Sequence, residues 1–592
     1  MNNAFPETGT LANLLLRYLA EEKVEYIFGI PGGPLMPLYE ALFKFDRIKP
    51  IIAKHEEGAA FMADGYARAT GRLGVCCATT GPGSTNLLTG VACAYADSVP
   101  LLVITAQVAT SVFGKGAAQE STYYGVDIVD MFKPVTKFSA MVHSAEHGDS
   151  LFRSALRTAL SGRRGPVHIN IPADYMKKEV PQIVVAPENY RIESRQFARE
   201  AIKQAAHLLL HAANPVIIAG NGVNVSAGND ELRQLAEKLC IPVATSPKGK
   251  GAFPENHILS LGVLGFAGSS LADKYLLSGK ADVVLAAGTS LGELPSANWD
   301  ARLSPSKALI HIDIDPEEIG KNYAVTTGIV GDAKAVLKEL NYQIDRELKW
   351  LTPPAKNGLA SIRTLKTIIE SEANAAAENA GLDSIPIKQP RILAELRKAL
   401  PSDAILFIDI GTCMPWAINC FPVYEPRTFF VNLGFGSMGY AMAAGIGAKL
   451  GMPNKNVFVL AGDGAFAMNG FEIHTAVEMN IPVVWIIINN SGLGMIHQGE
   501  QMQFKGQFCT SKYQNSLKVT EIAKGLGADA IKISDPRDLS GAFATAVKAT
   551  RPTVIEVMTS IEELAPMGRR MESLDTMFIK ESKNAFPATR DN

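Results

Sequence analysis

The sequence predicts an α/β protein with three doubly wound parallel-sheet domains. Short apolar runs, typical of strands buried on both faces, alternate with helical patterns along the chain. The 51 glycines fit the many sharp turns that such an alternation requires. Residues 456–490 show the repeating unit most clearly, because a strand, a helix and a second strand follow one another there.

Length and composition describe an ordinary globular chain. Its 592 residues are enough for about three or four domains. A net charge of −2 indicates neither a nucleic-acid nor a membrane partner. The seven cysteines are scattered and lack metal-ligand spacing, so we expect reduced thiols. No signal peptide begins the chain and no apolar run reaches about 18 residues, so we expect a soluble cytoplasmic protein.

Residues 1–190 are predicted to form the first domain. An amphipathic pattern over 8–22 predicts the opening helix, and the turn Pro31-Gly32-Gly33 ends the first strand. A helix is expected over 58–71, and the turn GPGSTN leads into another. The predicted strands of this domain lie at 25–30, 51–57, 74–80, 100–107 and 166–172, and the last of them closes the domain.

Two further blocks show the same alternation of predicted strands and helices. Residues 191–350 form the predicted central domain and residues 391–565 the third, and the similar order of elements allows a common fold in all three. The predicted central elements are helices at 197–211, 229–239 and 269–277 and strands at 215–220, 241–246, 282–288 and 308–315. A linker over 351–390 contains an Ala-rich piece that fits either a helix or a mobile segment, and the tail over 566–592 has no periodicity.

The third block contains the most informative segment. Strands are predicted at 404–411 and 428–432, before a Gly-rich stretch over 434–451. A buried strand over 457–461 then ends at Gly462-Asp463-Gly464, a helix spans about 465–479, and a strand over 483–488 delivers Asn489 and Asn490. Because parallel strands open on the same sheet edge, we expect Asp463 and Asn490 to lie close together.

Asp463 and Asn490 offer two hard oxygen ligands beside a helix N-terminus. Such ligands suit a magnesium ion whose other ligands are phosphate oxygens. Gly464 lets the backbone approach the phosphate. The alternative is a tight turn with a capping Asp, and the strand that ends in Asn-Asn 27 residues later argues against it.

This pattern resembles the diphosphate–magnesium signature of thiamine diphosphate (ThDP) enzymes. The segments FGIPGG, HEEGAA, GPGSTN and PLLVITAQVATSVFG are similar, in order and spacing, to acetohydroxyacid (acetolactate) synthases. The resemblance covers most of residues 8–190 and 395–500. It implies a pyrimidine-binding first domain, a diphosphate-binding third domain, and a homodimer or homotetramer whose active sites combine the first domain of one subunit with the third of another.

The resemblance also implies roles for individual residues. Glu56 falls on the catalytic glutamate, whose carboxyl group hydrogen-bonds to N1′ of the aminopyrimidine, a task that suits a poorly solvated carboxyl. Glu57 is the runner-up, and both residues also fit the helix dipole of a first turn. The implied cofactor-binding residues are Asn86, Gly411, Thr412, Gly436, Met438, Gly464, Ala465 and Met495. The implied metal ligands are Asp463, Asn490 and the Gly492 carbonyl, and the implied substrate pocket contains Gly33, Ala118, Gln119, Gln498 and Gly499.

Several pocket positions depart from the biosynthetic synthases. Those enzymes have Phe where this chain has Ala118, Lys at Ala173, Trp at Gly499, and arginines at Ser290 and Leu294. The losses predict a larger pocket without the cation that pairs with the carboxylate of a second 2-oxoacid. We therefore expect a carboligase that decarboxylates pyruvate or a related 2-oxoacid and uses a larger or non-acidic acceptor. Arg569 and Arg570, in the tail, are candidates to replace the lost cation.

Other interpretations stay open from the sequence. FAD is implied in the central block of the biosynthetic enzymes, and the arginine lost at Ser290 argues against it here. The alternatives are an acetolactate synthase proper, a simple 2-oxoacid decarboxylase, or an inactive regulatory homologue. Retention of Glu56, Asp463 and Asn490 disfavours the inactive homologue. His497 is a candidate to face the acceptor, whereas His474 is expected to be structural.

Overall fold

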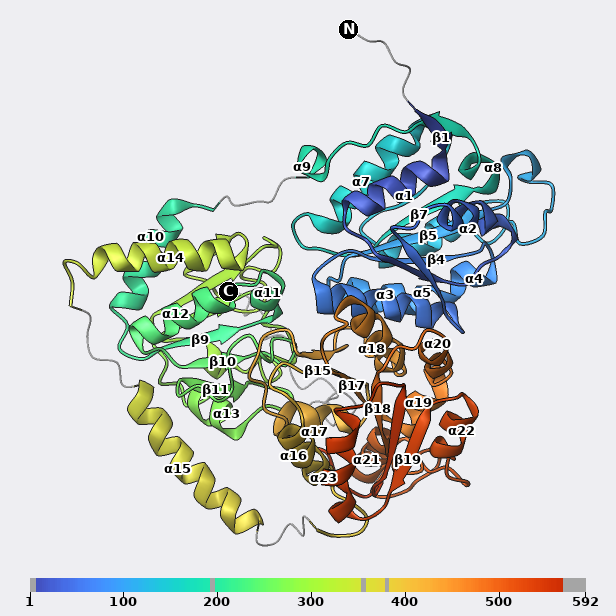
Figure 1. Ribbon diagram of the computed structural model, residues 1–592. Coiled ribbons are helices and arrows are strands. Elements are labelled where there is room, and N and C mark those ends of the chain that lie inside the picture. Colours follow the sequence, from blue (N-terminus) through green and yellow to red (C-terminus); the bar gives the residue numbers. More distant parts are fainter. Residues whose placement is uncertain (1–6, 192–196, 353–357, 378–382, 568–592) are drawn as a thin grey trace, which may run out of the picture.

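The computed structural model describes residues 7–191, 197–352, 358–377 and 383–567. It contains three six-stranded sheets in which every pairing is parallel, together with a two-stranded antiparallel sheet of β1 (Thr8–Thr10) and β8 (Glu179–Pro181). Figure 1 shows the three sheets as separate α/β units, the first in blue, the central in green and the third in orange to red. The predicted fold class is confirmed.

The first sheet contains the strands that carry the candidate catalytic segment. Most of its central strands are buried on both faces, as parallel sheets covered by helices require. In spatial order its strands are β3 (Lys49–Ile52), β2 (Tyr26–Gly29), β4 (Gly74–Ala78), β5 (Leu101–Gln107), β7 (Val167–Pro172) and β6 (Ser139–Met141).

The third sheet has the same topology as the first. Numbered along its own chain segment, each reads 2-1-3-4-6-5. The strands of the third sheet, in spatial order, are β16 (Phe429–Val431), β15 (Ile405–Ile408), β17 (Val457–Gly462), β18 (Val484–Asn489), β20 (Thr553–Met558) and β19 (Asp529–Ile533).

The central sheet differs and reads 3-2-1-4-5-6, the order typical of dinucleotide-binding domains. The three domains therefore have two different sheet topologies although their elements alternate in a similar way. The common fold that the sequence allowed is shared by the first and third domains but not by the central one. The central strands, in spatial order, are β11 (Ser260–Val263), β10 (Val243–Thr245), β9 (Pro215–Ala219), β12 (Val283–Ala287), β13 (Ala308–Asp313) and β14 (Thr327–Val330).

Helices cover the faces of each sheet (Figure 1). Those of the first domain are α1 (Leu11–Glu21), α2 (Met36–Phe43), α3 (Glu56–Thr70), α4 (Pro82–Asn86), α5 (Leu88–Ala96), α6 (Ile128–Phe132), α7 (Gly148–Leu160), α8 (Ala173–Met176) and α9 (Pro187–Tyr190). The central helices are α10 (Arg199–Leu210), α11 (Asn221–Val225), α12 (Asn229–Leu239), α13 (Ser270–Leu276) and α14 (Ala333–Glu347), followed by α15 (Gly358–Ala377) within the predicted linker. The third domain has α16 (Gln389–Ala399), α17 (Cys413–Cys420), α18 (Tyr440–Gly451), α19 (Asp463–Asn469), α20 (Glu472–Glu478), α21 (Gly494–Gln503), α22 (Val519–Gly525) and α23 (Leu539–Ala546).

Several predicted elements have different limits in the structure. The helix expected over 465–479 is two helices, α19 and α20, separated by Gly470 and Phe471; a Cβ at Gly470 would lie 2.4 Å from the Phe466 carbonyl oxygen, so this junction requires glycine. The strand expected over 51–57 ends at Ile52, and Glu56 already begins α3. The opening helix begins at Leu11, and β8, rather than the strand over 166–172, is the last strand of the first domain.

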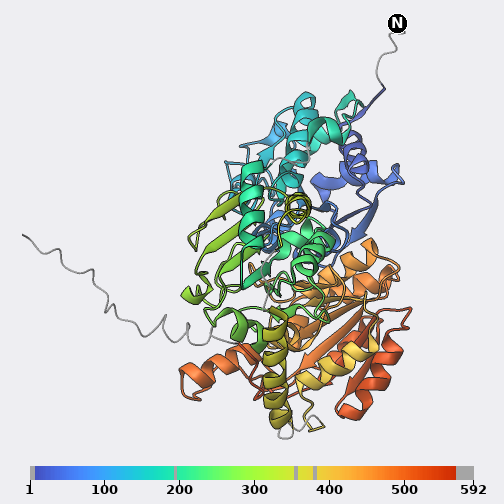
Figure 2. The ribbon, with the colours of Figure 1, turned by 90° about the vertical axis from the view of Figure 1, so that its left-hand side faces the viewer.

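The first and third domains are packed through α3 and α18. A Cβ at Gly65 would lie 2.0 Å from the Ala444 carbonyl oxygen, and one at Gly447 would lie 1.8 Å from that of Met62, so only glycine permits this approach. Figures 1 and 2 both show the first domain above the third, and Figure 1 shows α18 at the side of the third domain that faces the first. This contact brings the start of α3, where Glu56 lies, towards α19 and α20.

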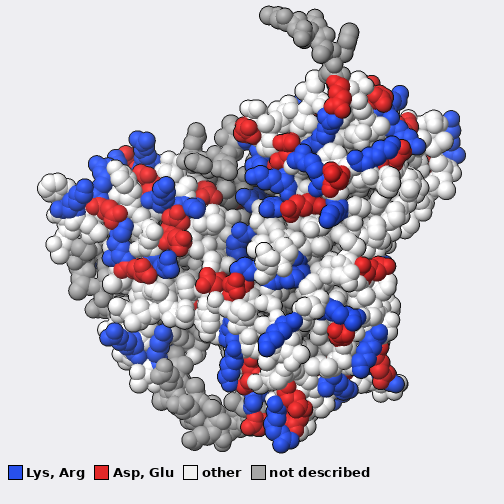
Figure 3. All heavy atoms as spheres, viewed as in Figure 1, with Lys and Arg blue, Asp and Glu red and all other residues white. Residues whose placement is uncertain are grey.

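The charged surface has no dominant sign on the face that Figure 3 shows. Lys and Arg side chains intermingle with Asp and Glu over all three domains. This distribution agrees with the small net charge of the chain. Within the described part of the chain, no helix is long and apolar enough to cross a membrane.

Candidate active site

Asp463 lies where β17 meets α19, at the carboxyl edge of the third sheet. Its carboxylate accepts hydrogen bonds from the backbone N–H groups of Gly464, at 2.9 Å, and Gly492, at 3.2 Å. The side chain is buried, and burial raises the pKa of this carboxyl to about 6 despite those donors. A cation beside it would favour the charged form.

The two asparagines at the end of β18 have different surroundings. Asn489 is held by the Leu517 carbonyl and the Glu556 carboxylate, at 3.0 and 2.7 Å. The side-chain oxygen of Asn490 is buried and has no hydrogen-bond partner among the described residues. A buried hydrogen-bond acceptor without a partner is energetically costly, so this oxygen is a suitable ligand for a cation.

The donor set around Asp463 suits a hard divalent cation. One carboxylate, one amide oxygen and the nearby backbone of Gly492 come from two neighbouring strands, and β17 pairs with β18 up to Gly462 and Ile488. Within the described residues no group of three or more His, Cys, Asp and Glu side chains could hold a metal. The remaining ligands would therefore be oxygens of a bound group or water, as is typical of magnesium.

The other third-domain residues singled out from the sequence gather at the same edge. A Cβ at Gly464 would lie 3.0 Å from the terminal carbon of Met438, and one at Gly494 would lie 3.4 Å from the Thr412 hydroxyl. Thr412 follows β15 and accepts a 3.3 Å hydrogen bond from Gln389. Gly411 and Gly436 are half-buried in loops, Met495 is half-buried near the start of α21, and Ala465 is fully buried in α19.

Asp409 is a residue of this edge that the sequence reasoning missed. Its carboxylate accepts from the N–H groups of Ile410, Gly439 and Ala441 at 2.8, 2.9 and 2.7 Å. It therefore joins the loop that contains Thr412 to the start of α18, directly after Met438. Burial raises the pKa of this carboxyl to about 7. The available signal was an aspartate that ends an otherwise apolar strand.

Glu56 begins α3, and the imidazole of His55 caps this helix by accepting from the Glu57 N–H. The Glu56 carboxylate is 9% exposed and accepts a 3.0 Å hydrogen bond from Asn86. A Cβ at Gly83 would lie 3.2 Å from it. Glu56 and Asn86 are therefore brought together within the first domain, and no hydrogen bond in the described chain joins Glu56 to Asp463.

The structure separates the predicted pocket residues into open and engaged positions. Gly33, at the start of a short 3-10 helix, and Ala118 and Gln119, in a loop, are exposed on the first domain, and Gly499 is half-buried on α21, where a Cβ would meet no atom within 4 Å. Gln498 is buried instead, and its amide both donates to the carbonyl and accepts from the N–H of Ala565, each at 3.0 Å. Gln498 therefore binds the chain that leads to the tail.

The two histidines also have defined roles. His497 is fully buried, and its ring nitrogens contact the Ser511 hydroxyl and the Glu562 carboxylate at 3.1 and 3.0 Å, which leaves neither of them to face an acceptor. His474 lies 3.7 Å from the Glu478 carboxylate. Arg569 and Arg570 lie outside the described residues.

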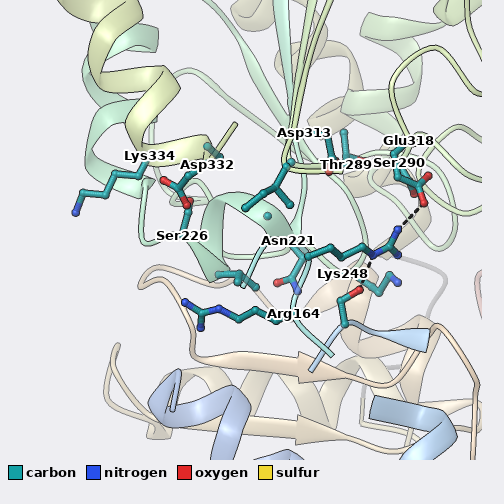
Figure 4. Close-up of a pocket in the computed structure, with 18 of the residues that line it drawn as sticks. Arg164, Asn221, Ser226, Lys248, Thr289, Ser290, Asp313, Glu318, Asp332 and Lys334 are labelled. Atoms are coloured by element: carbon teal, nitrogen blue, oxygen red, sulfur yellow. Dashed lines mark hydrogen bonds and ion pairs between the residues drawn. The ribbon is translucent and has the colours of Figure 1, made fainter. Parts of the chain in front are cut away.

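A second concave site lies between the central and first domains. Its cavity of about 970 Å³ is lined by loops that follow β9, β12 and β13, and Figure 4 shows Asn221, Ser290 and Asp313 around it. Two ion pairs lie on its wall: Arg163 contacts Glu318 at 2.6 Å, and Lys248 of the central domain contacts Asp97 of the first at 3.0 Å. The volume is sufficient for a nucleotide-sized ligand.

Comparisons with known proteins agree with this geometry. Residues 9–130 match the N-terminal TPP binding domain of thiamine pyrophosphate enzymes, residues 202–340 the central domain, and residues 409–557 the C-terminal TPP binding domain. The chain is 36% identical to a probable acetolactate synthase large subunit of Methanococcus aeolicus, over 95% of this chain and 94% of the relative. It is 33% identical to the acetolactate synthase isozyme 3 large subunit of Escherichia coli K12, over 97% and 99%.

Proposed function

The chain belongs to the family of thiamine pyrophosphate (thiamine diphosphate) enzymes of the acetolactate synthase type. From this premise we propose that it decarboxylates a 2-oxoacid, with pyruvate as the expected donor. We propose further that it ligates the acyl unit to an acceptor unlike that of the biosynthetic synthases. The observation that carries the proposal is the buried carboxylate of Asp463 together with the buried, unpartnered side-chain oxygen of Asn490 at the end of the neighbouring strand.

Magnesium is the ion we propose for this pair. Asp463 and Asn490 supply side-chain oxygens, the carbonyl of Gly492 a third ligand, and the diphosphate of the cofactor the others. We expect Gly464 to let the backbone approach the phosphate and the first amides of α19 to donate to its oxygens. Thr412, Met438 and Met495 would hold the rest of the cofactor, with Met438 as the bulky residue that keeps it bent.

Glu56 is the proposed catalytic residue. Its carboxyl group is buried at the start of α3 and oriented by Asn86, which suits a proton held at N1′ of the aminopyrimidine. When bound, thiamine diphosphate supplies an acidic C2–H whose conjugate base attacks a carbonyl carbon and stabilises the charge left by loss of CO₂. Glu57 is engaged by Asn469 at 3.2 Å, which supports Glu56 over its neighbour for this role.

The acceptor is proposed to be larger or less acidic than a second pyruvate. A Cβ at Gly499 would meet no atom within 4 Å, and the side chain of Ala118 is small and exposed. Leu294, at the position of a family arginine, packs against an apolar cluster and supplies no cation. A buried carboxylate there would be unpaired, which disfavours an acidic acceptor.

A homodimer or homotetramer is proposed as the active form. Glu56 and Asp463 belong to different domains and do not bond to each other within the described chain. Large apolar side chains in and after α19 are exposed, with Met468 57% and Phe471 64% accessible, as are Tyr123 and Tyr124 on the first domain. Such surfaces fit a partner subunit. Sedimentation analysis tests this, because a monomer with full activity would contradict it.

FAD is a weaker proposal for the central cavity. The strand order and volume suit a dinucleotide, whereas Ser290 offers no cation where the biosynthetic enzymes have arginine. Visible absorbance of the purified protein decides whether a flavin is present.

The domain limits 1–190, 191–350 and 391–565 stay proposals, which limited proteolysis tests.

The reaction is tested by a product assay with pyruvate, ThDP and magnesium, with and without added aldehydes. A mixed product in the presence of aldehydes supports the proposed carboligase. Acetolactate alone would identify an acetolactate synthase proper, and acetaldehyde alone a simple decarboxylase. Absence of turnover and of ThDP binding would identify a regulatory homologue.

A further inference from the structure

Glu472, the first residue of α20, is bound to the segment that precedes Glu56 in another domain. One carboxylate oxygen accepts from the backbone N–H groups of Lys54 and His55, both at 2.9 Å, and the other lies 3.1 Å from the Lys54 nitrogen. The Glu472 side chain is 1% exposed. A buried carboxylate of the third domain therefore holds the backbone of the first.

The surroundings of this carboxylate are shaped for it. The Thr475 hydroxyl, one turn along α20, donates to it at 2.8 Å. On the other side, a Cβ at Gly58 would lie only 2.2 Å from the carboxylate oxygen, so the space beside α3 exists because residue 58 is glycine. Burial raises the pKa of the carboxyl, and the four donor contacts oppose that effect.

The contact fixes a segment that has little local support. Strand β3 ends at Ile52 and α3 begins at Glu56, so the N–H groups of Lys54 and His55 belong to neither element. Their hydrogen-bond acceptor comes instead from Glu472. Because Glu56 directly follows His55, the carboxylate sets the backbone position from which the catalytic side chain extends.

The same third-domain segment carries the proposed metal ligand. Asp463 begins α19 and Asn469 ends it, where the Asn469 amide donates to the Glu57 carboxylate at 3.2 Å. Glu472 follows three residues later. A segment of ten residues thus has a metal-site carboxylate at one end and two contacts to the start of α3 at the other.

We propose that Glu472 is a positioning residue for Glu56, holding the turn before α3 so that the Glu56 carboxyl group lies in register with the aminopyrimidine. This inference rests on the proposed role of Glu56. It assigns Glu472 no contact with cofactor or substrate.

Two variants disturb the contact from opposite sides. E472Q keeps the size of the side chain but places an N–H group against the Lys54 N–H, and G58A leaves the carboxylate intact but displaces it. E478Q is the matched control, because Glu478 ends the same helix and, among the described residues, pairs with the side chains of Lys54 and His474 rather than with backbone N–H groups.

The first measurement needs no cofactor. Amide hydrogen exchange of the cofactor-free protein should show Lys54 and His55 protected in the wild type and in E478Q, and exchanging about tenfold faster in E472Q and G58A. Unprotected amides in the wild type would overturn the proposal, whichever variants fold.

The second measurement follows deuterium exchange at C2 of bound ThDP. We expect a decrease of about tenfold to a hundredfold in E472Q and G58A, with a ThDP dissociation constant within about threefold of the control, because misplacement by about 1 Å has costs of this order. Exchange at the control rate would reduce Glu472 to a structural residue and refute the proposal. If the wild type itself bound no ThDP, or if E56Q exchanged C2 normally, the proposed function would fail instead.

Discussion

Substitution of Gly499 by tryptophan tests the proposed acceptor pocket most directly. Gly499 lies in the middle of α21, is half-buried, and has no atom within 4 Å of the position of a Cβ. Its φ is not positive, so a larger residue causes no backbone strain. We therefore expect G499W to fold, with the indole occupying space that a bulky acceptor would use.

The magnitude follows from the volume that the two groups would share. Forcing extra atoms into a filled site costs about 1–3 kcal/mol, or roughly five- to 150-fold in rate. We expect kcat/KM for a bulky aromatic aldehyde to fall by such a factor in G499W. The value for a small acceptor such as acetaldehyde should stay within about threefold, because its atoms do not reach the added ring.

The assay compares kcat/KM for the two aldehydes at fixed pyruvate, ThDP and magnesium. G541W is the matched control, since Gly541 on α23 is exposed, has a non-positive φ and equally open surroundings. Equal losses for both acceptors, or losses that G541W reproduces, would refute the placement of Gly499 in the acceptor pocket.

Three further predictions concern the metal site and stability. D463N should weaken magnesium-dependent ThDP binding at least about tenfold, since an amide replaces the charged ligand; equal calorimetric titrations with and without a chelator would contradict this. R68M should lower the free energy of unfolding by about 3–5 kcal/mol in urea, because the buried carboxylate of Asp64 loses its cation and that of Asp97 keeps only Lys248, whereas R72M, at an exposed pair, should change it by less than about 1 kcal/mol. Burial lowers the pKa of His168 to about 3. Between pH 6.5 and 3 the unfolded chain therefore binds a proton on this histidine that the folded chain does not bind. The free energy of unfolding should fall by about 2 kcal/mol from pH 6.5 to 5 as a result. H168Q should remove that part of the slope, and unchanged slopes would disprove it.

The residues predicted best from the sequence are those whose positions depend on local order. Asp463 and Asn490 each follow an apolar strand, and parallel strands that are joined by one helix must end at the same edge. The hydrogen bond between Glu56 and Asn86 was not predicted, because the family resemblance implied a role for each residue but no contact between them. The structure shows both residues at the ends of neighbouring segments of the first domain.

Contacts between distant segments were beyond the sequence pattern. Asp409 looked like one more residue of a strand, and its role depends on where Gly439 and Ala441 fold back onto it. Gln498 lies in the expected active-site segment, yet its amide binds the backbone of Ala565, because the chain after β20 returns over α21. Periodicity carries no information on such returns.

Sheet topology explains why all of the sites lie where they do. In an open α/β sheet, ligands bind where the strand order reverses, since the loops on either side of that point diverge. In the third domain the reversal lies between β15 and β17, whose following residues include Thr412 and Asp463, and in the first domain Asn86 closes the segment after β4. In the central domain it lies between β9 and β12, where Asn221 and Ser290 line the large cavity. The alternation of strands and helices along the sequence is the same in all three domains and does not reveal the spatial order of the strands. The position of the cavity between the central and first domains depends on that spatial order, so the sequence pattern could not predict it.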